Sequence, residues 1–185
     1  DPVLRQWLIG RALGKYQGEP EFTPHRPPYL EGLLPLNRQS PKPPISFSEL
    51  STDKPRSVIT LPLPGEDVTL NPGDEDALFK RDFKDTETLL AVHRFAWVPL
   101  LGRDLDPAWV NTLWQAWQDA YSQPSHDWPW HPYTATERAI NILDFAKRHG
   151  LPGPVDNTLN LLAAHGPAIA EQLEYFGDHH TSNHL

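Results

Sequence analysis

The sequence predicts an all-α fold of antiparallel helical hairpins, preceded by an extended arm that is rich in proline. Three observations predict this fold class. Apolar residues recur at helical spacing in several segments from residue 86 onward. These segments are joined by short connections, which place successive helices as antiparallel neighbours. Most of the 21 prolines lie before residue 75, where they exclude long helices.

The first domain, residues 1–75, begins with a helix and continues as the extended arm. Asp1 and Pro2 form an N-cap followed by proline at the first helical position, and apolar residues keep helical spacing to about Leu13. Nine prolines in residues 19–57 exclude further helix, because each removes a backbone donor and restricts the residue before it. We expect this arm to lie extended across the helices, and disorder is the alternative.

A short hairpin is predicted at the end of the first domain. Residues 57–63 and 67–70 have the composition of extended segments, and they flank a turn at Pro64-Gly65.

The second domain, residues 76–185, is predicted to be helical. Residues 86–98 form a first helix with one apolar face, and Asp106-Pro107 begins a second with the same cap and proline as the N-terminus. The second helix carries an aromatic stripe, which we assign to the core rather than to a ligand site: Val110, Leu113, Trp114, Trp117 and Tyr121.

Two further helices are predicted near residues 134 and 156. The first begins with a capping box, in which Thr134 bonds the amide of Glu137 and the Glu137 carboxylate bonds back. Gly150 provides its left-handed stop. We expect Gly166-Pro167 to kink or break the last helix, because proline lacks the backbone donor that a helix interior needs.

Charge and composition exclude several classes of function. A net charge of −8 argues against a nucleic-acid partner, and an acidic polysaccharide would require a locally basic cleft. The chain has no cysteine for a disulfide or a thiolate metal site. No apolar run reaches the ~20 residues that span a membrane. The chain also lacks methionine and begins at Asp1, so we expect an incomplete record of a longer protein.

The loop before the third helix of the second domain has the composition of a sugar-binding surface. Trp128, Trp130, His131 and Tyr133 lie in this loop, and Arg138 follows one turn into the helix. Indole rings stack on the apolar face of a sugar, while a guanidinium binds its hydroxyls or carboxylate. The alternative is structural: the tryptophans plug the end of a helical bundle, and Arg138 pairs with a buried carboxylate.

The C-terminal segment, residues 178–185, allows three interpretations. His180 and His184 are four residues apart and would bind a metal with Asp178, or the segment is a solvated tail without function. In the third, the Asn183 amide donates to a uronate carboxylate as enolate-like charge develops, and the adjacent His184 imidazole holds that carboxylate or transfers a proton.

Four sequence segments occur together in an order and spacing that resemble a known family. They are Trp130-His131-Pro132-Tyr133, Glu137-Arg138, Leu173-Glu174 and Ser182-Asn183-His184-Leu185. Through them, residues 86–185 resemble the heparinase II/III-like polysaccharide lyases. The resemblance implies an incomplete α/α toroid followed by a β-sandwich domain. It also implies cleavage of an acidic, uronate-containing polysaccharide, of the glycosaminoglycan or alginate kind, by β-elimination.

The resemblance assigns roles to individual residues, without a cofactor or a metal. Asn183 and His184 are the implied catalytic residues. The expected substrate-binding residues are Trp130, His131, Tyr133, Arg138 and His180. The family's acid/base tyrosine and a further histidine lie beyond residue 185. We therefore expect this chain to be the N-terminal part of the enzyme, to pack on its own C-terminal part, and to be inactive by itself.

Two other functions remain compatible with the sequence. One is a non-catalytic carbohydrate-binding helical domain that uses the same tryptophan and arginine residues. The other is a metal-dependent hydrolase that uses His180, His184 and Asp178. A polysaccharide substrate would favour a periplasmic or secreted protein.

Overall fold

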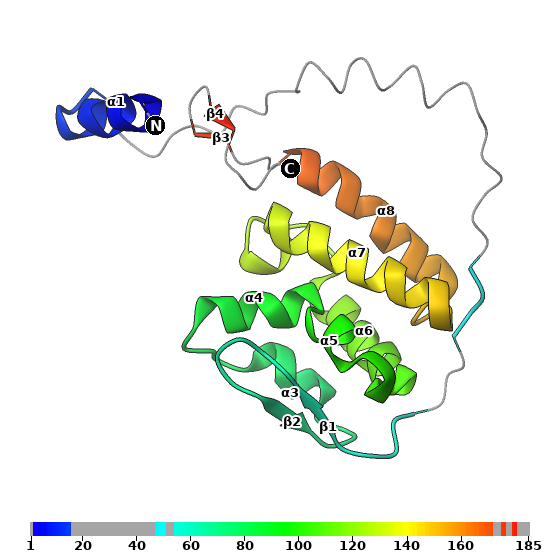
Figure 1. Cartoon of the computed structure of the whole chain (residues 1–185). Helices are drawn as coiled ribbons and strands as arrows, with labels where there is room; N and C mark the ends of the chain where they lie inside the picture. The colour runs from blue at the N-terminus through cyan, green and yellow to red at the C-terminus, as the bar shows by residue number, and fades with distance from the viewer. Residues whose placement is uncertain (1, 16–46, 51–53, 172–174, 177–178, 181–185) are drawn as a thin grey trace, which may run out of the picture.

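A computed structural model describes residues 2–15, 47–50, 54–171, 175–176 and 179–180 of the chain (Figure 1). The predicted extended arm falls largely outside these residues, as do Asp178, Asn183 and His184. The side chain of His180 is also outside the described part of the structure.

The described part of the chain is mostly helical, as predicted. The helices are α1 (Pro2–Ala12), α3 (Glu75–Lys80), α4 (Thr86–Arg94), α5 (Trp97–Leu101), α6 (Pro107–Tyr121), α7 (Pro132–His149) and α8 (Val155–Glu171). The 3-10 turns are η2 (Gly102–Asp104) and η3 (Trp128–Trp130). The strands are β1 (Ile59–Leu61), β2 (Val68–Leu70), β3 (Tyr175–Phe176) and β4 (His179–His180).

The predicted hairpin is confirmed as the antiparallel pair β1–β2. Leu61 pairs with Val68, and both side chains are buried against the helices. Thr60 and Thr69 pair on the solvent face, where their hydroxyls lie 3.1 Å apart. This alternation of apolar and polar residues is what fixes the register of a half-buried hairpin.

The aromatic stripe of α6 forms the centre of the core, as the sequence predicts. Trp114 and Trp117 are fully buried, and their rings stack at 5.6 Å. The indole of Trp109, on the same helix, donates to the Ser57 carbonyl at 2.9 Å. This bond holds the segment that precedes β1 against α6. The predicted cap is also present, because the Asp106 carboxylate accepts from the Ala108 amide at 2.9 Å.

The predicted helix over residues 86–98 is interrupted, so that α4 and α5 are separate. Phe95 adopts a left-handed conformation with φ of 54°, and its amide is close enough to bond the carbonyls of Ala91 and Val92. Its ring is fully buried, 5.8 Å from Trp97 and 5.6 Å from Trp114. These three rings pack together where the chain turns at Phe95. The spacing of apolar residues in the sequence continues through this position and does not reveal the turn.

The predicted capping box at Thr134 is wrong. Helix α7 begins two residues earlier, at Pro132, whose fixed φ suits the first helical position. Thr134 consequently lies inside the first turn and is buried, with no hydrogen-bond partner for its hydroxyl among the described residues. Glu137 faces Arg94 instead, at 3.3 Å.

Of the kink or break predicted at Gly166-Pro167, the break does not occur, because α8 continues through Pro167 to Glu171. The carbonyl that loses its donor to this proline belongs to Ala163. Ala163, Gly166 and Pro167 are all exposed, so water can serve the released carbonyl. The cost of the proline is therefore lower than in a buried helix.

Helices α7 and α8 lie side by side and run in opposite directions (Figure 1). Gly150 ends α7 with φ of 98°, which confirms the predicted glycine stop. In the connection that follows, Leu151 donates to the Ser48 carbonyl at 2.9 Å, and its own carbonyl accepts from Leu50 at 3.1 Å. This connection therefore holds a segment that lies a hundred residues earlier in the chain.

Replacing Gly150 by alanine should destabilise the protein strongly. The new Cβ would lie 2.8 Å from the Ser48 carbonyl oxygen and 3.0 Å from the Leu50 nitrogen, in a backbone conformation that disfavours side chains. We expect the free energy of unfolding, measured with urea, to fall by roughly 2–4 kcal/mol. Gly102→Ala is the matched control: φ is also positive, but a Cβ meets nothing within 4 Å, so the loss should be about 1 kcal/mol. Equal losses in the two variants would contradict this account.

Candidate functional site

The loop between α6 and α7 is anchored in the core by Trp130. Its ring is fully buried, 5.9 Å from Trp117 and 4.8 Å from His165, and its indole nitrogen donates to the Tyr121 carbonyl at 2.8 Å. The structural alternative considered for the tryptophans therefore holds for Trp130, which closes the end of the helical layer. Trp128, two residues earlier, is 49% exposed.

Arg138 lies beneath this loop and is fully buried. Its Nη1 atom donates to the carbonyl of Pro129 at 2.6 Å and to that of His93 at 3.2 Å. Its Nε atom donates to Nε2 of His165 at 3.0 Å. The guanidinium also lies over the ring of Trp117, with 3.9 Å between Cζ and the ring centroid. One side chain thus contacts groups from α4, α6, η3 and α8.

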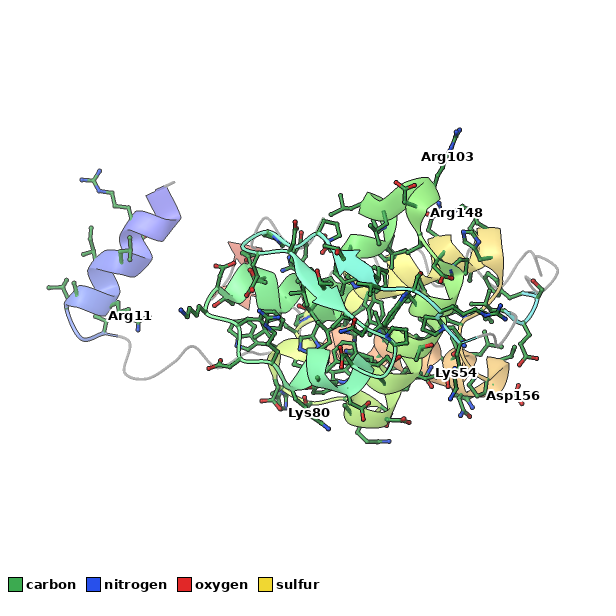
Figure 2. The ribbon with its side chains drawn as sticks, turned by 90° about the horizontal axis from the view of Figure 1, so that it is seen from below. Arg11, Lys54, Lys80, Arg103, Arg148 and Asp156 are labelled. Atoms are coloured by element: carbon green, nitrogen blue, oxygen red, sulfur yellow. The ribbon has the colours of Figure 1, made fainter. Side chains whose placement is uncertain are left out.

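The charge of Arg138 is stabilised without a carboxylate, since none lies within ion-pair distance among the described residues. Burial lowers the pKa of Arg138 to about 9, so the side chain remains charged at neutral pH. The faces of Trp117 and Trp130 and two backbone carbonyls supply the negative potential. Other cations, such as Lys80, Arg103 and Arg148, are exposed (Figure 2).

The two histidines around Arg138 are neutral. Burial, and then the charge of Arg138, lowers the pKa of both His93 and His165 to about 4. Because His165 Nε2 accepts from Arg138, its Nδ1 carries the proton and donates to the Leu161 carbonyl at 2.8 Å. His93 has the opposite tautomer, since its Nδ1 accepts from the indole of Trp117 at 3.2 Å.

These positions change two of the predicted substrate contacts. Trp130 and Arg138 are both fully buried, so neither side chain has a surface that a polysaccharide could touch in this arrangement. Instead, the buried indole of Trp130 and the hydrogen bonds from Arg138 to two carbonyls hold the loop that precedes α7 in place. The predicted contact with substrate is therefore replaced by a positioning role.

Three aromatic side chains at the end of the loop and the start of α7 form what we call the aromatic surface: Trp128 and Tyr133, which are exposed, and His131, which is half-buried. The rings of Trp128 and His131 lie 5.6 Å apart, and Tyr133 is 39% exposed. Arg94 of α4 stacks on Tyr133, with 4.3 Å between Cζ and the ring centroid. The surface has aromatic faces exposed to solvent and a guanidinium held at its edge.

Two glutamates orient Arg94 and Tyr133. Arg94 contacts Glu87 at 3.2 Å and Glu137 at 3.3 Å. A hydrogen bond to the Glu137 carboxylate, and then its negative charge, raises the pKa of Tyr133. The phenol therefore stays protonated at neutral pH and serves as a donor rather than as a base.

The predicted catalytic residues Asn183 and His184 lie outside the described residues. His180 lies in β4, where it pairs with Tyr175 of β3, so its backbone is not helical. The described residues contain no group of three or more histidine, aspartate or glutamate side chains that could hold a metal. The predicted metal ligands Asp178 and His184 are not among those residues.

Sequence reasoning missed His165 and the part played by Arg94. A signal for His165 exists, because the buried residues Thr158, Leu161, His165 and Ala168 follow helical spacing along α8. A histidine within an apolar stripe requires a partner, and in this protein the partner is Arg138.

No family model, no curated protein and no solved structure matches the chain. Within the described residues, no helix is both long and apolar enough to cross a membrane.

Acid should destabilise the protein through His93 and His165. Their pKa is about 4 in the folded protein and about 6.5 in an unfolded chain, so between these values only the unfolded chain takes up the protons. The free energy of unfolding should fall as the pH is lowered from about 6.5 to about 4, by up to about 1.4 kcal/mol per pH unit for each histidine.

Urea denaturation at a series of pH values measures this slope. Glutamine can accept the same hydrogen bonds without titrating, so His93→Gln and His165→Gln should each make the slope shallower. A double variant with the slope of the unmodified protein would show that the two buried imidazoles do not cause the acid sensitivity.

Proposed function

We propose that this chain is the N-terminal part of a polysaccharide lyase that cleaves uronate-containing polysaccharide by β-elimination. One observation carries the proposal: the Trp130–Tyr133 motif, Arg138 and the Asn183-His184 pair occur in the order and spacing of heparinase II/III-like lyases. The helical character of residues 86–171 is compatible with the helical domain of such an enzyme. An incomplete α/α toroid is part of the proposal.

The aromatic surface supports a carbohydrate substrate. Trp128 and Tyr133 expose ring faces on which the apolar face of a sugar can stack. Arg94 is buried and paired with two carboxylates, so it supports the Tyr133 ring from behind.

In the proposed reaction, a base removes the proton on the carbon next to the uronate carboxylate. The electron pair forms a carbon–carbon double bond, the bond to the glycosidic oxygen breaks, and that oxygen takes up a proton. Charge develops on the carboxylate as the first proton leaves. An amide donor at Asn183 would stabilise this charge, and His184 would hold the carboxylate or transfer a proton.

Replacing Asn183 by alanine tests the proposal. In the full-length protein, Asn183→Ala should lower turnover by roughly 10²–10³-fold, as expected when one donor to a developing oxyanion is lost. The assay follows the new ultraviolet absorbance of the unsaturated uronate. Asn183→Asp should be at least as damaging, because a second carboxylate would repel that of the substrate. Near-normal turnover in Asn183→Ala would refute the catalytic assignment.

The alternatives give different results in the same experiment. A carbohydrate-binding domain without catalysis would produce no unsaturated uronate in any variant. A metal-dependent hydrolase would be disabled by His180→Ala rather than Asn183→Ala, and purified protein would contain metal.

Replacing Trp128 by alanine tests the aromatic surface separately from the chemistry. Loss of one stacking ring should raise KM about five- to tenfold and change kcat less than about twofold, since the ring contacts substrate before and during the reaction alike. Leu100→Ala, which removes another exposed apolar side chain, is the control and should leave both constants unchanged. An unaltered KM in Trp128→Ala would remove this surface from the substrate-binding site.

A further inference from the structure

A concave site lies between the C-terminal end of α6, residues 122–124 and α8. Its volume is about 540 Å³, within the range that holds a small molecule. None of the residues that form the aromatic surface line it. We call it the amide pocket, after the four side-chain amides in its wall: Gln118, Gln123, Asn157 and Asn160.

The chemistry of the amide pocket suits hydroxyl groups. Each amide both donates and accepts hydrogen bonds, as a hydroxyl does. One wall can therefore bind several hydroxyl groups, each as a donor or as an acceptor. Ser122 adds a further hydroxyl. Leu161, Ala164 and Pro124 contribute apolar surface in the same pocket. A ligand with many hydroxyls and one apolar face would match both kinds of surface.

One of the amides is held in place by the core. The Nε2 atom of Gln118 donates to the Thr158 hydroxyl at 3.0 Å, so its carbonyl oxygen remains to accept from a ligand. Thr158 is itself fixed, because it donates to the Pro152 carbonyl at 2.6 Å and accepts from the indole of Trp114 at 2.8 Å. An acceptor fixed before binding loses little conformational entropy when a ligand arrives.

The charge of the pocket selects against acidic ligands. Of the described residues that line the wall, Asp119 is the one charged residue, and none is a lysine, arginine or histidine. A carboxylate or sulfate in this pocket would face a like charge without a cation to offset it. The Asp119 carboxylate is also a strong hydrogen-bond acceptor for hydroxyl groups of a ligand. Both effects favour a neutral ligand with several hydroxyl groups.

We propose that the amide pocket binds a neutral sugar residue. This site is separate from the aromatic surface and does not depend on the lyase proposal. The amides and Asp119 bind the hydroxyls, and the apolar surface of Leu161 and Ala164 contacts the C–H face of the ring. A uronate residue is disfavoured by the charge of Asp119, so the pocket has the opposite charge preference from that of the proposed catalytic site.

Nuclear magnetic resonance of the 185-residue chain tests the proposal with three neutral disaccharides as probes: cellobiose, maltose and lactose. At least one should shift the side-chain amide signals of the four pocket residues saturably, with a Kd on the order of millimolar. The amides of Asn71 and Asn141, which bond Asp74 and the Arg94 carbonyl, should not move. Absence of a saturable shift with all three probes would overturn the proposal.

Variants locate the binding site. The exposed pair Asn157→Ala and Asn160→Ala, combined, should weaken binding of the active disaccharide at least about fivefold, since each amide contributes a hydrogen bond. Gln115→Ala changes an amide on α6 that does not line the pocket, and affinity should stay the same. Unchanged affinity in the double variant would show that the disaccharide binds elsewhere.

A matched pair of ligands tests the charge preference. Methyl glucoside and methyl glucuronide differ in one carboxylate, and the glucoside should bind at least about fivefold better, the effect of one like charge nearby. Asp119→Asn should reduce this preference to less than about twofold, whereas Asp104→Asn, outside the pocket, should preserve it. Tighter binding of the glucuronide by the unmodified chain would contradict the assignment to a neutral sugar.

Discussion

The structure depends on a buried guanidinium that has no carboxylate partner among the described residues. Arg138 bonds the carbonyls of His93 and Pro129, the imidazole of His165 and the ring face of Trp117. These groups belong to four different elements, and a charge buried among them is tolerable only when all of them are in place. Arg138 therefore couples the arrangement of α4, α6, α8 and the loop before α7.

Helix geometry explains why the neighbouring carboxylate of Glu137 does not pair with Arg138. Glu137 is adjacent to Arg138 in sequence, but neighbouring residues on a helix point about 100° apart. Glu137 therefore faces Arg94 and Tyr133 at the surface, while Arg138 faces the core. A second positive charge next to Arg138 would be repelled, so the two neighbouring histidines are neutral in the folded protein. Acid that protonates them therefore lowers the stability of the fold.

Local signals in the sequence predicted those features that local interactions determine. The proline and cap at Asp106-Pro107, the aromatic stripe of α6, the hairpin and the glycine stop of α7 were all found where expected. The interruption at Phe95 involves contacts between distant residues. The start of α7 at Pro132 follows a local signal, proline at the first helical position, which the capping-box prediction overlooked. The site was predicted less well, since the identity of a tryptophan or an arginine does not show whether its side chain is buried or exposed. Only the structure separates Trp130 from Trp128.

The loop between α6 and α7 contributes residues to both proposed binding sites, one near each of its ends. Its first residues, 122–124, line the amide pocket, and its last form the aromatic surface. Between them, Trp130 bonds the Tyr121 carbonyl and Arg138 bonds that of Pro129, so the middle of the loop is fixed to the core. A change at either end can then alter one site without the other. Loss of Trp130 in the loop, or of Arg138 in α7, would remove the contacts that hold the middle of the loop and would free both of its ends.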